Sequence, residues 1–179
     1  MRKVLTLLVL LATPLLAFGQ DEAARRSAGC GPNEIQFDVK QDKKQHPKGV
    51  LEPGKALVYI LDNRGGVGVG IPPARVGVDG TWVGANFKAS YFYFAVAPGT
   101  HNLCTSGKGA FESVTNASLV ATTFTAEAGQ IYFFAVGYFP ETQMQTLEVR
   151  EIAPAEGELQ IGKLPFSTFT QKPNNSPGH

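Results

Sequence analysis

Four glycines lie between Gly65 and Gly70, directly after an apolar run that ends at Asp62. Glycines that follow a strand can bind a phosphate through their backbone N–H groups when they open a helix. Neither the dinucleotide spacing Gly-x-Gly-x-x-Gly nor the phosphate-loop ending Gly-Lys-Ser/Thr is present, and Pro72 and Pro73 follow instead. We therefore interpret this stretch as a flexible connection between two strands and predict no cofactor.

Other residue types that perform chemistry are present, but they are scattered. The chain has three histidines, which are His46, His101 and His179, and three acids close together near its end, which are Glu151, Glu156 and Glu158. No zinc-ligand spacing and no Gly-x-Ser-x-Gly elbow occurs, and the acids are typical of a solvated face. The sequence thus predicts no catalytic and no metal-binding residues. A hydrolase would need His101 beside an acid in a cleft.

The first 19 residues have the pattern of a secretory signal peptide. Two basic residues precede an apolar run over residues 4–18, and small residues stand before an expected cut ahead of Gln20. An uncleaved membrane anchor is the alternative, but the run is short and Pro14 interrupts it. The pattern favours an exported protein, periplasmic or extracellular, without a membrane span after cleavage.

Charge excludes two classes of partner. Cleavage would remove Arg2 and Lys3 from 16 basic residues and none of the 15 acidic ones, so the net charge would fall from +1 to −1. This balance attracts neither nucleic acid nor an anionic membrane.

Cys30 and Cys104 are the only cysteines. Because an exported protein meets oxidising conditions, we predict a disulfide between them. The alternative is a lipid anchor at Cys30, but three polar residues precede Ala28 where a lipidation motif needs leucine after the apolar run.

Short β-forming runs recur about every ten residues and predict the elements that position these side chains. They occupy residues 34–40, 55–62, 75–85, 90–96, 100–106, 118–126, 130–139 and 145–152. Residues 55–62 are apolar on both faces and indicate a central strand, and Asp79-Gly80 indicates a type I′ hairpin turn. We predict an all-β fold, a single antiparallel β-sandwich of about seven to nine short strands.

The composition and the predicted strands divide the chain into four parts. The predicted parts are the signal peptide at residues 1–19, an N-terminal extension at 20–33, the sandwich at 34–164 and a disordered tail at 165–179.

Several motifs of the central part occur in the order of a known family. They are Pro53-Gly54-Lys55-Ala56, Val76-x-Val78-Asp79-Gly80 with Gly84, Pro98-Gly99-x-His101, and Ala128-Gly129 before residues 131–136. On these residues the segment from 53 to about 150 resembles the bacterial domain of unknown function 2846. The hairpin is also similar to the surface-layer PEGA module, without its Pro-Glu-Gly-Ala signature. The resemblance implies an exported β-sandwich and no established activity.

The leading hypothesis is a non-catalytic domain of the cell envelope or periplasm that binds a partner or has a structural role. The partner would be an envelope protein or a glycan, and a carbohydrate- or peptidoglycan-binding module is the alternative. Residues 90–96 and 130–136 are apolar on both faces, so a partner would cover one face unless the chain itself does. Trp82, next to the hairpin turn, is the candidate contact residue, and the alternative is that it packs in the core, as most of the aromatic residues should.

Overall fold

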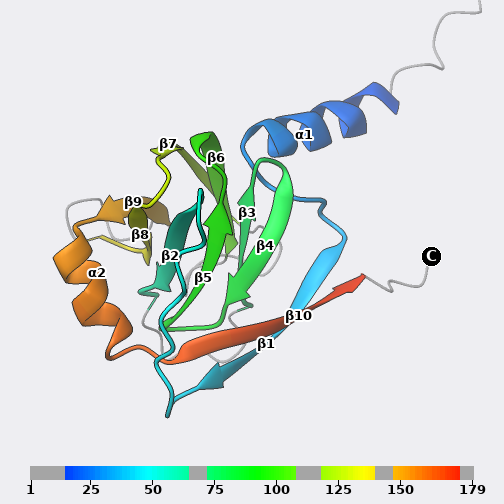
Figure 1. Cartoon of the computed structure of the whole chain (residues 1–179). Helices are drawn as coiled ribbons and strands as arrows, with labels where there is room; N and C mark the ends of the chain where they lie inside the picture. Colours follow the sequence, from blue (N-terminus) through cyan, green and yellow to red (C-terminus); the bar gives the residue numbers. More distant parts are fainter. Residues whose placement is uncertain (1–14, 65–71, 108–117, 140–146, 174–179) are drawn as a thin grey trace, which may run out of the picture.

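The computed structural model describes residues 15–64, 72–107, 118–139 and 147–173, and its strands form a sandwich of two sheets (Figure 1). The larger sheet has the order β1 (Ile35–Asp42), β10 (Phe166–Pro173), β5 (Ser90–Val96), β2 (Ala56–Asp62), β8 (Ile131–Gly137) and β9 (Glu148–Ile152). The smaller has the order β4 (Thr81–Asn86), β3 (Ala74–Val78), β6 (Gly99–Gly107) and β7 (Ser118–Ala126). The helices are α1 (Leu15–Ser27) and α2 (Pro154–Ile161).

This architecture confirms the predicted all-β sandwich. Neighbouring strands are antiparallel except in two pairs, β2 with β8 and β10 with β5. The described part contains ten strands, more than the seven to nine predicted, because the end of the chain adds β10.

The central position predicted for β2 is confirmed, since all seven of its residues are buried. Val58 and Ile60 point into the core between the two sheets, where they join Phe92 and Phe134. Alternate residues point the other way, because successive side chains of a strand face opposite sides of the sheet.

The chain itself covers that second face. Phe133 lies under α2, beside Gly157, and Ile161 of the same helix joins the cluster. The segment before β2 covers the rest: Gly49 N–H donates to Tyr59 Oη at 2.8 Å, and Tyr91 Oη donates to the carbonyl of Pro47 at 2.9 Å. The strands that are apolar on both faces therefore need no partner protein to cover this side of the sheet.

The β3–β4 hairpin turns at Asp79 (φ 51°) and Gly80 (φ 84°), so both central residues have the positive φ of the predicted type I′ turn. Asp tolerates this conformation better than most residues, and Gly adopts it without strain.

The predicted disordered tail is wrong for residues 166–173, which form β10. This strand pairs antiparallel with β1 along its whole length, from Ile35 opposite Pro173 to Asp42 opposite Phe166. Phe169 packs against Phe37 and Phe92. The domain thus extends beyond residue 164, and residues 174–179 lie outside the described part.

The N-terminal part also differs from the expected extension. Residues 15–27 form α1, so the expected cut ahead of Gln20 falls within this helix; residues 1–14 lie outside the described part. After α1 the chain turns at Gly29, with φ 88°, and runs onto the outer face of the smaller sheet.

Candidate functional site

The predicted disulfide between Cys30 and Cys104 is confirmed. It joins the segment after α1 to β6, with a Cα–Cα distance of 5.1 Å, and both cysteines are fully buried. Since the Cys30 sulfur is bonded to Cys104 and buried, it is not available in this structure for a lipid.

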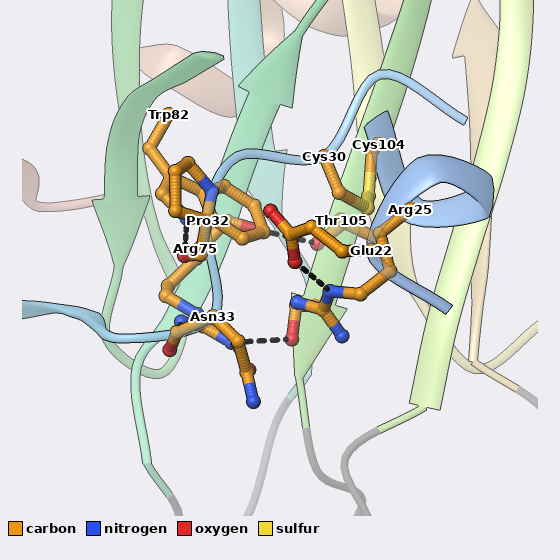
Figure 2. Close-up of a disulfide and its surroundings, with 10 residues drawn as sticks. Glu22, Arg25, Cys30, Pro32, Asn33, Arg75, Trp82, Cys104 and Thr105 are labelled. Atoms are coloured by element: carbon orange, nitrogen blue, oxygen red, sulfur yellow. Dashed lines mark hydrogen bonds and ion pairs between the residues drawn. A yellow bond between two sulfur atoms is a disulfide. The ribbon is translucent and has the colours of Figure 1, made fainter. Parts of the chain in front are cut away.

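Trp82 lies next to the disulfide and corrects the contact prediction, because only 6% of this residue is exposed. Its Nε1–H donates to the carbonyl of Pro32 at 2.6 Å (Figure 2). Gly31 passes so close that an added Cβ would lie 2.5 Å from Trp82 Cδ1. The N-terminal segment therefore buries Trp82, which cannot serve as an exposed contact residue.

Arg75 of β3 extends along the same face and lies 4.6 Å from the centre of the Trp82 ring. Its Nη1 donates to the carbonyls of Asn33 (3.0 Å) and Ile35 (2.8 Å), and its Nη2 donates to Ser106 Oγ (3.2 Å). Burial lowers the pKa of Arg75, and the nearby charge of Arg25 lowers it further. The guanidinium thus fixes the chain on both sides of residue 34.

A hollow of about 160 Å³ opens beside this guanidinium. Its polar lining comes from Arg75, Ser106 and Gln36, and its apolar lining from Phe37, Pro72 and Pro73. Gly107 also borders it, and none of the described residues that line it is acidic. This site could not be predicted from the sequence, because Arg75 and Ser106 are neighbours only through the register of β3 with β6.

His101 meets the first half of the condition for a hydrolase, since its Nδ1 lies 2.6 Å from Asp79 Oδ2. Its Nε2, however, lies 2.8 Å from the carbonyl of Ala97, so both ring nitrogens have partners. No ring nitrogen is left to accept a proton from a nucleophile, and the pair instead ties the hairpin to β6. That role is supported by Asn102 N–H, which donates to Asp79 Oδ1 at 2.9 Å.

Burial lowers the pKa of His101, but the hydrogen bond to Asp79, the bond to Ala97 and the Asp79 charge outweigh it, so the net pKa is raised. For Asp79, burial raises the pKa, but the bonds from His101 and Asn102 and the His101 charge outweigh burial and lower it. Both shifts favour the charged pair.

The remaining residues singled out in the sequence lie apart from one another. His46 Nδ1 contacts the Leu164 carbonyl at 2.9 Å, and His179 is outside the described residues. Glu158 pairs with Lys48 at 2.6 Å, Glu156 bonds Gln160, and Glu151 is exposed on β9. Among the described residues, no three His, Cys, Asp or Glu side chains group as metal ligands would.

Residues 65–71 of the glycine stretch lie outside the described part, but Asp62 and Arg64, just before it, lie within that part. The Arg64 guanidinium donates to both oxygens of Asp62, with Nη2 at 2.7 Å from Oδ2, and both residues are buried. The charge of Arg64 is thus balanced by the Asp62 carboxylate. The spacing Asp-x-Arg after a buried strand is a signal that the sequence analysis did not use.

The edges of the two sheets differ in their side chains. β1 carries Asp38, Lys40 and Asp42, β9 carries three charged residues in five, and β4 is short and packs on β10. β7 has nine residues and none is charged. Its outward side chains are Leu119, Ala121, Thr123 and Thr125.

Within the described residues, we find no helix that is both long and apolar enough to cross a membrane. Comparison of the chain with protein-family models, curated proteins and solved structures gave no match. The resemblance to the domain of unknown function 2846 and to the PEGA module therefore stays a prediction.

Proposed function

We propose that the chain is an exported, non-catalytic domain, closed by its disulfide, that binds an extended segment of a partner protein along β7. The observation that carries this proposal is the uncharged, nine-residue edge of β7. An edge strand presents unpaired N–H and C=O groups, and natural proteins usually protect such edges with charges, prolines or short length. β1 and β9 carry such charges, whereas β7, which packs against β9 as β4 packs against β10, carries no charge and no proline along its nine residues.

We propose a sheet edge as the binding surface because the chain itself covers the outer faces of both sheets. α2 and the segment before β2 cover the larger sheet, and residues 29–31 lie over β3, β4 and β6. Strand addition uses backbone hydrogen bonds for affinity and alternate side chains for specificity. Since the outward side chains of β7 are small or apolar and neutral, they suit a partner strand of low charge.

The export part of the proposal is supported by the disulfide, because disulfides persist in oxidising compartments and are rare in the cytosol. The glycan-binding alternative needs a solvent-facing aromatic platform, and none of the Phe, Tyr and Trp residues whose side-chain exposure the structure describes is exposed. We therefore do not propose it.

The test is photo-cross-linking in cells that export the full chain. A benzophenone amino acid replaces Thr125 on β7 or, as the matched control, Lys40 on the charged edge β1; both positions are exposed. We expect a partner adduct from position 125 and none from position 40. Ala121→Lys should reduce that adduct at least about tenfold because it charges the edge, whereas Thr168→Lys on β10 should not.

Equal adducts from both positions, or insensitivity to Ala121→Lys, would contradict binding at β7. An adduct made of two copies of this chain would also contradict the proposal, because the occupant would then be the chain itself.

A further inference from the structure

Two arginines from distant parts of the sequence approach the outer face of the smaller sheet. Arg25 comes from α1 and Arg75 from β3, and both extend to the same side of the disulfide (Figure 2). Arg25 is the charged group whose field acts on Arg75, so the two guanidiniums are electrostatically coupled. Two like charges on a partly buried face repel each other unless an anion lies nearby.

Arg25 has hydrogen-bond donors without acceptors. Its Nε and Nη2 are buried and make no hydrogen bond within the described structure. Glu22 forms an ion pair with Arg25 at 4.0 Å from Nε, which is too long for a hydrogen bond, and Glu22 accepts a hydrogen bond from Arg26 Nε at 3.2 Å. Buried donors are usually satisfied, so such an exception indicates a missing water, ion or ligand.

Arg75 has its own reason to attract an anion. Its guanidinium donates to the carbonyls of Asn33 and Ile35, the Asn33 amide oxygen and the Ser106 hydroxyl, all of which are neutral. Among the described residues, those that line the hollow beside Arg75 include no acidic residue, and Arg25 lies outside this lining. Ser106 Oγ accepts from Arg75, so its own hydrogen remains able to donate.

We propose that this face holds an oxyanion, a carboxylate or a phosphate group, bound between Arg25 and Arg75 beside Ser106. The anion would accept from the buried donors of Arg25 and compensate the charge of Arg75. Guanidinium groups suit this chemistry because their planar N–H donors match the oxygens of carboxylates and phosphates. The site is distinct from the β7 edge, and either proposal can fail without the other.

The test uses the full exported chain in its oxidised form. Sodium phosphate and sodium acetate are titrated separately at constant ionic strength against sodium chloride, and binding is followed by the fluorescence of Trp82. Trp82 reports on the site because Arg75 lies over its ring. We expect a saturable change in fluorescence with phosphate, acetate or both. The anion that saturates the change at the lower concentration shows whether the site prefers a phosphate or a carboxylate group.

Arg25→Gln should weaken that binding at least about tenfold, since it removes charged hydrogen-bond donors. Arg26→Gln is the matched control: it removes the same charge from the same helix, but the Arg26 side chain is 63% exposed against 12% for Arg25. Far-UV circular dichroism verifies that both variants are folded.

No saturable response to either anion above the chloride control would overturn the site. Equal weakening by Arg25→Gln and Arg26→Gln would also overturn it, because the effect would then be one of net charge.

Discussion

His101 and Asp79 lock the hairpin turn to β6, and their pKa shifts make this lock depend on pH. The folded pKa of His101 is raised above its ordinary 6.5, so its contribution to stability is complete below pH 6.5 and is lost as pH rises through the folded pKa. The pKa of Asp79 is lowered from 3.8, so its contribution is present above that pH and is lost as pH falls through the folded pKa. The lock is therefore strongest between these values.

His101→Gln should lower the free energy of unfolding more at about pH 5.5 than at about pH 8.5. The difference should stay at about 1 kcal/mol or less, because Asp79 is 48% exposed and solvent screens the pair. Urea unfolding of wild type and variant at both pH values measures it. The same loss at both pH values would show that His101 acts through packing and not through charge.

The Asp62–Arg64 pair is the second residue-scale feature. Burial raises the pKa of Asp62, and the charge and hydrogen bonds of Arg64 oppose that rise. Asp62→Asn would leave the buried Arg64 guanidinium without this carboxylate and should cost about 3–5 kcal/mol.

Asp38→Asn is the matched control for Asp62, since it removes the same charge from an exposed pair with Lys172 at 3.0 Å and should cost about 1 kcal/mol or less. Chemical denaturation of both variants makes the comparison. Similar losses of unfolding free energy in the variants at positions 62 and 38 would show that the buried Asp62–Arg64 pair stabilises the fold no more than an exposed pair does.

At the scale of elements, the disulfide holds the N-terminal segment over Trp82. It closes a sequence separation of 74 residues, for which chain entropy gives about 4 kcal/mol of stabilisation. The double variant Cys30→Ala/Cys104→Ala should lose about that much in urea unfolding. Trp82 is the only tryptophan, so its emission should also shift to longer wavelength as the segment loosens. Unchanged emission in a folded variant would show that the other contacts of residues 31 and 32 hold the segment without the bridge.

The elements predicted from sequence are those whose signals are local. The apolar run of β2 and the Asp79-Gly80 turn lie within a few residues, and both were predicted correctly. Trp82 was named as a candidate contact residue, and its burial could not be predicted because its cover, Pro32, lies 50 residues earlier. β10 was missed because it is polar in composition and pairs with a strand about 130 residues away; Lys172 and Asp38, for example, are 134 residues apart.

The candidate site was likewise hard to predict, because its residues are distant from one another in the sequence. Cysteine pairing could be predicted because only one pairing exists, whereas the charge of Arg25 acts on Arg75 only because residues 28–33 cross the sheet. An Arg-Arg doublet in the sequence does not indicate which arginine is buried.

At the scale of the whole molecule, both sheets have outer faces that the chain covers itself, and β7 is the long edge that carries no charge. Binding at β7 and the anion site near Arg25 both presuppose that the protein leaves the cytoplasm and that residues 20–33 stay attached to the sandwich. The central claim is therefore an exported domain closed by its disulfide.

Intact mass spectrometry of the protein recovered from exporting cells, alkylated without reduction, tests this claim most directly. The account predicts the mass of residues 20–179 less two hydrogens, with no alkyl group on Cys30 or Cys104 and no lipid. A chain that retains residues 1–19, two alkylated cysteines, or the added mass of a lipid at Cys30 would contradict it.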